Sequence, residues 1–84
     1  MPPVTMYTTD ACPFCIRAKT LLSRRGIEYD EINLARDPDG RAELSKITGM
    51  YTFPQIIIEG RPLGGFNELR AADRSGTLGE LVAA

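Results

Sequence analysis

Histidine and tryptophan are both missing from this 84-residue sequence. Without histidine, the chain can build neither a Cys-His or Ser-His catalytic pair nor a metal site with imidazole ligands. It has two cysteines, too few for a four-thiolate zinc site within one chain. Two cysteines in such a chain are by default inert buried thiols, so their spacing has to decide whether they carry chemistry.

Long hydrophobic runs and a charge excess of one sign are missing too. No apolar run approaches the ~18 residues of a membrane span, and residues 1–5 have neither the basic start nor the apolar stretch of a signal peptide. Ten basic residues against eleven acidic ones give a net charge of -1, without a strongly basic stretch. We therefore expect a cytoplasmic protein that binds neither membranes nor nucleic acids.

The composition itself is that of an ordinary globular protein, with 43% hydrophobic and 25% charged residues. The chain has room for one small domain, expected over residues 1–84. Its patterns are of two kinds: residues 4–8 are β-branched and aromatic, whereas Phe14, Ala18, Leu21 and Leu22 recur on one face of a helix. The expected order is a strand at 4–8, a helix from 13 to about 25, a strand at 27–34, a helix from 37–40 to Gly49, a strand at 55–59, a short strand ending near 63, a helix at 67–74 and a short terminal helix at 77–82.

This order, βαβαββα with the short terminal helix, predicts an α/β fold. The helix between the first two strands favours their parallel pairing. The tight turn at residues 59–62 joins the last two strands in a hairpin, and the apolar run at 55–59 is expected to be a central strand. A four-stranded mixed sheet flanked by helices is the minimal thioredoxin-like fold.

The chemistry is expected in the sequence Cys12-Pro13-Phe14-Cys15. Proline commonly occupies the first position of a helix, which makes Cys12 the N-cap. Its sulfur can then accept hydrogen bonds from the amides of Phe14 and Cys15, and the helix dipole adds positive potential. Both effects favour the thiolate and lower the pKa of Cys12 below the value of about 8.5 for a free thiol.

The same helix places the two cysteines at bridging distance. Residues three apart on a helix have Cα atoms roughly 5 Å apart, within the range of about 4.4–6.8 Å that a disulfide needs. Cys15 is expected to be more buried than Cys12, so Cys12 attacks and Cys15 displaces the captured thiol. A lone pair of this kind could instead be half of a zinc or iron-sulfur site shared across a dimer, but its place between a strand and a helix favours redox chemistry.

Three motifs in this order resemble the glutaredoxin family, over nearly the whole chain. The first, at residues 7–22, contains the Tyr-Thr strand end, Cys-Pro-Phe-Cys, Arg-Ala-Lys and Leu-Leu. The second is Thr-Phe-Pro-Gln-Ile at 52–56, and the third is Gly-Gly-Phe-Asn-Glu-Leu at 64–69. The resemblance implies a glutathione-dependent thiol-disulfide oxidoreductase that reduces protein disulfides and glutathione mixed disulfides. It implies catalysis by Cys12 and Cys15, glutathione as reducing co-substrate, no tightly bound cofactor or metal, and a monomer whose partners are disulfide-containing or glutathionylated proteins.

The resemblance also implies a glutathione site. The motif proline of the family follows a cis bond, so Pro54 is expected to lie against the thiols and to turn the backbone of Phe53 toward the ligand. An extended peptide can pair there as an added strand. The helix that opens at residues 65–67 offers free amides for the γ-glutamyl carboxylate. The implied glutathione-binding residues are Cys12, Phe14, Thr52, Phe53, Pro54, Gly65, Phe66 and Asn67.

Two departures from the family concern the glycine carboxylate of glutathione. Thr9 stands where the family often has lysine, and Met50 where it often has a basic residue; Asn67 also replaces a frequent aspartate. Weak glutathione binding or another reductant is therefore considered. One alternative is a glutaredoxin-like electron donor reduced by thioredoxin reductase, although such donors usually have a tryptophan-containing C-terminal motif. Another is a dimeric iron-sulfur carrier with bridging glutathione. Plain thioredoxin fits less well, because Ala11 replaces its tryptophan.

Overall fold

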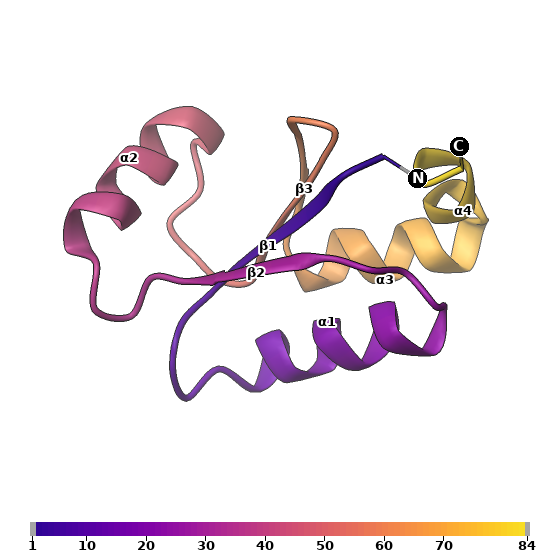
Figure 1. Ribbon diagram of the computed structural model, residues 1–84, viewed down its shortest axis with the longest axis horizontal. Coiled ribbons are helices and arrows are strands. Elements are labelled where there is room, and N and C mark those ends of the chain that lie inside the picture. Colours follow the sequence, from indigo (N-terminus) through magenta and orange to yellow (C-terminus); the bar gives the residue numbers. More distant parts are fainter. Residues whose placement is uncertain (1, 84) are drawn as a thin grey trace.

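The computed structural model describes residues 2–83, and its elements follow the predicted order (Figure 1). Pro13 and Pro38 stand at the first turns of their helices, where the missing amide hydrogen costs nothing, and Gly49 ends the second helix with a φ of 72°. The elements are β1 Val4–Thr8, α1 Pro13–Arg24, β2 Asp30–Asn33, α2 Pro38–Thr48, β3 Gln55–Ile58, β4 Arg61–Gly64, α3 Phe66–Ser75 and α4 Thr77–Leu81.

The strands form a four-stranded mixed sheet in the order β2-β1-β3-β4. β1 pairs in parallel with β2, with Tyr7 opposite Ile32, and antiparallel with β3, with Met6 opposite Ile56. β3 and β4 form the expected hairpin. The predicted α/β architecture and the parallel pairing are thus confirmed.

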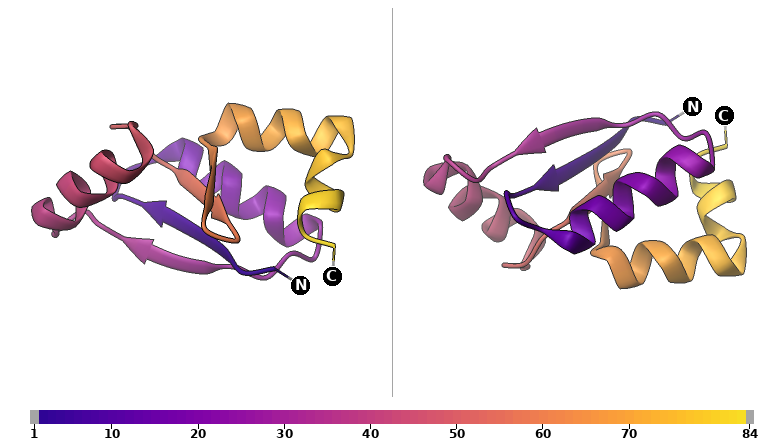
Figure 2. Two further views of the ribbon diagram at one scale, coloured as in Figure 1. Left: turned by 90° about the horizontal axis from the view of Figure 1, so that it is seen from above. Right: turned by 90° about the horizontal axis from the view of Figure 1, so that it is seen from below.

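α1 and α3 lie side by side on one face of the sheet, and α2 lies toward the opposite side, at the end of the sheet to which β1 and β2 point (Figure 2). The core lies under α1 and α3, where Leu22 and Leu69 are fully buried against Met6 and Ile56. Because α1 is anchored along its length, its N-terminal end is held at the edge where β1 ends. That end carries the cysteines.

Several predicted boundaries differ from the structure by one residue, and the start of the second strand differs by more. The strands expected at 55–59 and ending near 63 are Gln55–Ile58 and Arg61–Gly64, and the helices expected at 67–74 and 77–82 are Phe66–Ser75 and Thr77–Leu81. The second strand, expected over 27–34, is limited to Asp30–Asn33, because Ile27 donates its amide to Leu22 and so belongs to the end of α1. α3 begins at Phe66 rather than Asn67, because Gly65 is the N-cap. Among residues 2–83, no helix is long and apolar enough to cross a bilayer.

Candidate active site

Cys12 and Cys15 are joined by a disulfide, and their Cα atoms are 5.2 Å apart, close to the distance that the helical spacing predicts. Cys12 is the N-cap of α1, and Pro13 occupies the first turn. The amide of Cys15 donates to the Sγ atom of Cys12 at 3.2 Å. The capping position expected for Cys12 is therefore present.

The amide of Phe14 was also expected to donate to this sulfur, and the structure shows no such bond among the described residues. The Sγ atom of Cys12 is bonded to the sulfur of Cys15, which draws it over the third residue of the helix. Cys15 is only 2% exposed, whereas Cys12 is half-buried. The less accessible sulfur is thus the one that was expected to resolve.

The loop at residues 50–54 lies beside the cysteines. Its Phe53-Pro54 bond is cis, as the resemblance implied. The Sγ atom of Cys12 lies 3.7 Å from the carbonyl oxygen of Phe53, and Pro54 is buried. The backbone of Phe53 therefore borders the sulfur that is open to an incoming partner.

A groove of about 350 Å³ opens at this loop, and we call it the aromatic groove. The rings of Phe14 and Phe66 flank it, with centroids 5.9 Å apart. Phe14 is half exposed, so its ring offers an apolar wall to a ligand. The groove is lined by seven of the residues predicted for glutathione, namely Phe14, Thr52, Phe53, Pro54, Gly65, Phe66 and Asn67, and by Met50 and Glu68.

The first turn of α3 forms one end of the aromatic groove. Gly65 was expected to offer a free amide, but this amide donates to Oε1 of Glu68 at 3.0 Å. The φ of Gly64 is +131°, and a Cβ atom there would lie 2.7 Å from Cγ of Glu68, so a glycine lets the glutamate fold back. No described residue accepts from the amides of Phe66 and Asn67, which leaves these two donors for a ligand.

The sequence analysis did not identify Gln55 as part of the site. It is 2% exposed, and its Nε2 donates to the carbonyl oxygens of Met50 at 3.3 Å and Thr52 at 3.0 Å. Its Oε1 lies 2.9 Å from the hydroxyl of Thr48, which donates to it. Gln55 thus fixes the loop that carries Phe53. A lone amide at the start of an apolar strand was the available signal, because a buried polar group needs partners.

Basic side chains lie at a neighbouring hollow of about 410 Å³, which shares Phe53 with the aromatic groove. Arg41 and Lys46 line it together with Tyr51. The amino group of Lys46 is therefore a candidate for the role that Thr9 and Met50 cannot fill. Sequence alone could not establish its reach, because the course of the loop after α2 decides it.

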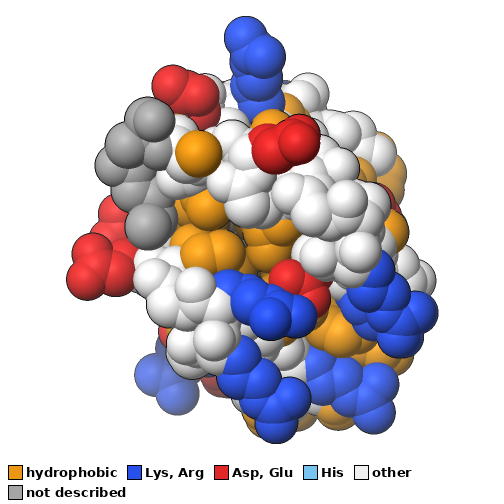
Figure 3. Space-filling view, turned by 90° about the vertical axis from the view of Figure 1, so that its right-hand side faces the viewer, with side chains coloured by type: hydrophobic (Ala, Val, Ile, Leu, Met, Phe, Trp, Pro, Cys, Tyr) orange, Lys and Arg blue, Asp and Glu red, His pale blue; other side chains and the backbone are white. Residues whose placement is uncertain are grey.

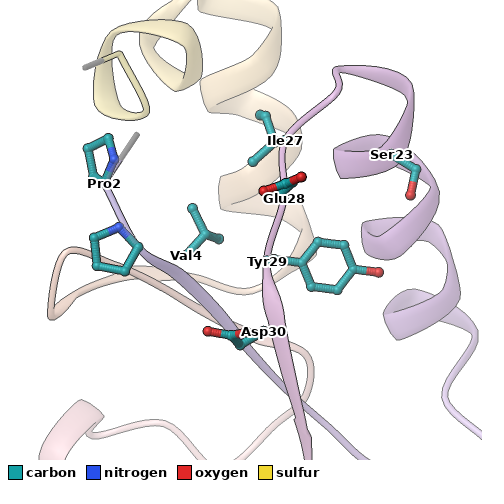
Figure 4. Close-up of a pocket in the computed structure, with 8 residues that line it drawn as sticks. Pro2, Val4, Ser23, Ile27, Glu28, Tyr29 and Asp30 are labelled. Atoms are coloured by element: carbon teal, nitrogen blue, oxygen red, sulfur yellow. The ribbon is translucent and has the colours of Figure 1, made fainter.

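Another hollow, of about 600 Å³, lies where the N-terminal stretch meets the end of α1 (Figure 4). Ser23 lines it, eleven residues along α1 from Cys12, so it is about 16 Å away along the helix. Glu28 and Asp30 contribute its carboxylates. The part of the chain that the structure describes brings together no metal-binding cluster of three His, Cys, Asp or Glu side chains.

Comparisons with known proteins agree on one family. The family model described as glutaredoxin matches residues 4–63. A glutaredoxin of Pseudomonas aeruginosa is 48% identical over 84 residues, all of both chains, and glutaredoxin 3 of Escherichia coli is 39% identical over 98% of this chain and 99% of its own. Among solved structures, glutaredoxin from Brucella melitensis has a TM-score of 0.87 at 43% identity, covering 98% of this chain and 89% of its own. The buckwheat glutaredoxin-glutathione complex has a TM-score of 0.89 at 30% identity, covering 96% of this chain and 76% of its own.

Proposed function

The chain belongs to the glutaredoxin family of thiol oxidoreductases, and from that premise we propose that it reduces protein disulfides and glutathione mixed disulfides with glutathione as reductant. The observation that carries the proposal is the aromatic groove, which opens beside the loop that borders the accessible sulfur of Cys12. A glutaredoxin of the same fold has been solved with glutathione. The need for free glutathione fits a reducing compartment such as the cytoplasm.

Reduction of a glutathione mixed disulfide needs only Cys12. Its thiolate attacks the glutathione sulfur, the substrate S–S bond breaks, and the protein thiolate leaves and takes up a proton. The thiolate of a second glutathione then attacks the glutathione sulfur bound to Cys12. This step forms glutathione disulfide and restores the Cys12 thiolate.

Reduction of a protein disulfide uses both cysteines. The Cys12 thiolate forms a mixed disulfide with one substrate sulfur and releases the other as a thiolate. The Cys15 thiolate then attacks the sulfur of Cys12, which releases the second substrate thiolate and forms the disulfide seen in the structure. Two glutathione molecules reduce this disulfide and leave as one glutathione disulfide. The burial of Cys15 restricts its attack to its neighbour.

Three kinds of contact would hold glutathione, two of them in the aromatic groove and one at the neighbouring hollow. The backbone beside the cis bond offers Phe53 for pairing with an extended peptide. The amides of Phe66 and Asn67 suit the γ-glutamyl carboxylate, which also benefits from the positive end of α3. At the neighbouring hollow, Lys46 offers a cation for the glycine carboxylate.

A coupled assay tests the proposal. The reduced protein is oxidised by a glutathione mixed disulfide and regenerated either by glutathione with glutathione reductase or by thioredoxin reductase. We expect sustained turnover with glutathione and glutathione reductase. Turnover with thioredoxin reductase alone would contradict the proposal and assign the chain to the glutaredoxin-like electron donors.

A further inference from the structure

Five of the ten basic residues of the chain line one hollow of about 670 Å³ between α1 and α3. Basic side chains gather over this region in the space-filling view (Figure 3). The hollow is lined by Arg17 and Arg24 from α1, by Arg25 at the C-cap of α1, and by Arg70, Asp73 and Arg74 from α3, and we call it the arginine groove.

Most of the positive charge in the arginine groove is uncompensated. Arg25 and Asp73 form a bidentate pair, with Nε to Oδ1 at 2.7 Å and Nη2 to Oδ2 at 3.0 Å. Within residues 2–83, none of the other four arginines has a carboxylate within salt-bridge distance. Like charges on two adjacent helices repel each other, and a bound polyanion would relieve this repulsion.

The arginine groove adjoins the aromatic groove. The guanidinium of Arg17 lies 5.2 Å from the ring centroid of Phe14, and that of Arg70 lies 5.8 Å from the centroid of Phe66. Phe66 lines both grooves. A chain that leaves the cysteines past these rings therefore enters a positively charged surface at once.

We propose that the arginine groove docks an acidic, extended segment of the protein substrate next to the cysteine that is being reduced. This inference rests on the proposed function. Cys12 and Arg17 are about 8 Å apart along α1, and Arg17 and Arg24 about 10 Å. An extended chain advances about 3.3 Å per residue. The fitting segment therefore has about three acidic residues that begin some three positions from the reactive cysteine.

The distribution of charge favours a short peptide over a nucleic acid or a membrane. The arginine groove has five cations against one carboxylate, while the whole chain has a net charge of -1, so the remaining sequence is acidic. A duplex or an anionic bilayer extends well beyond a groove of about 10 Å and would meet that acidic remainder. A segment of three residues stays within the groove.

Matched peptide substrates provide the test. One is the glutathionylated peptide Cys-Gly-Gly-Asp-Glu-Asp, and its partner is Cys-Gly-Gly-Asn-Gln-Asn; a second pair has the triplet before the cysteine. The enzyme is compared with a double variant, Arg24→Gln with Arg74→Gln. Both of these arginines are exposed and lie outside the aromatic groove. The control is Arg36→Gln with Arg61→Gln, which removes the same charge from exposed positions elsewhere.

We expect the wild type to prefer the acidic member of at least one pair, with a KM that rises as salt is added. Loss of two exposed charge pairs should raise this KM about 2- to 25-fold, while the control variant and the amide peptides are little affected. Equal KM values for acidic and amide peptides in both pairs would overturn the inference. An equal effect of the control variant would do so as well.

A second measurement separates docking from chemistry. A fluorescent acidic peptide with serine in place of cysteine should bind the wild type more tightly than it binds the Arg24/Arg74 double variant. Inactivity of the wild type toward every glutathione mixed disulfide would refute the proposed function without changing this result. Equal binding to both proteins, or tighter binding of a short DNA duplex than of the peptide, would overturn the docking inference.

Discussion

Replacing Gln55 by leucine should loosen the loop that borders Cys12 while leaving the cysteines in place. Leucine has a similar volume but removes the hydrogen bonds to the carbonyls of Met50 and Thr52 and the one from the hydroxyl of Thr48. Each bond contributes about 0.5–1.5 kcal/mol net. Water can replace part of this, because Thr52 is exposed and the other two partners are half-buried. We expect a loss of about 2 kcal/mol, well within the 5–15 kcal/mol of a typical domain.

Urea unfolding measures this loss, and the KM for glutathione reports its effect on the site. The KM should rise several-fold with little change in kcat, because in the proposed function the loop positions glutathione whereas α1 carries the thiols. The matched control is Leu78→Ala, at a buried position of α4 far along the chain, which should cost about 2–4 kcal/mol. Its KM should stay at the wild-type value. A Gln55→Leu protein with unchanged KM, or an equal KM rise in the control, would refute this reasoning.

Four further predictions concern the thiols, the carboxylate contact and pH. The pKa of Cys12, measured by thiolate absorbance in Cys15→Ser, should lie well below the value of about 8.5 for a free thiol; a value near 8.5 would contradict the capping argument. Cys15→Ser should retain activity on glutathione mixed disulfides and Cys12→Ser should lose it, and exchanged behaviour would reverse the assigned roles. Thr9→Lys should supply a cation in addition to Lys46 and lower the KM for glutathione several-fold at low salt with kcat unchanged, because an exposed charge pair is worth up to ~1 kcal/mol; an unchanged KM would mean either that a cation such as Lys46 or Arg17 already holds the carboxylate in full or that glutathione is not the natural reductant. The hydrogen bond from Lys19 holds the pKa of Glu31 below its usual 4.5, so the ionised carboxylate stabilises the fold above that pH, and this contribution is lost as the pH falls through the lower folded pKa. The urea midpoint of the wild type should therefore drop relative to that of Glu31→Gln below about pH 4.5. Parallel curves of midpoint against pH for the two proteins would argue against this contribution.

Short sequence signals were sufficient to predict helix ends where a single proline or glycine determines the backbone conformation. Pro13 marked the start of α1 and made Cys12 its cap, and Gly49 marked the end of α2. The second strand was predicted too long because its limits depend on pairing with β1 and on the amide of Ile27, which closes α1. Strand pairing and helix capping compete for the same residues. Which of them prevails depends on tertiary contacts, and the hydrophobic periodicity of the sequence does not reveal those contacts.

The same distinction applies to the candidate site. The motifs were sufficient to select seven of the nine residues that line the aromatic groove, because each belongs to a short segment of recognisable chemistry, whereas Cys12, also predicted, does not line it. The role of Gln55 depends on contacts with Thr48 at the end of α2 and with Met50 and Thr52 of the α2–β3 connection. The role of Glu68 depends on a turn that folds its side chain back. The arginine groove needs two helices distant in sequence to lie side by side. No local sequence motif predicts any of these three features.

The bond from the amide of Gly65 to Glu68 gives one of the three amides at the end of the aromatic groove an internal acceptor, while the amides of Phe66 and Asn67 have none among the described residues. A ligand carboxylate that binds this amide must displace the carboxylate of Glu68, so its net gain in binding free energy is the difference between two similar hydrogen bonds. In the proposed function, such exchange weakens the hold of this one amide on reduced and oxidised glutathione alike. A product that carries the same carboxylates as the proposed reductant would then leave faster, which would reduce product inhibition by glutathione disulfide.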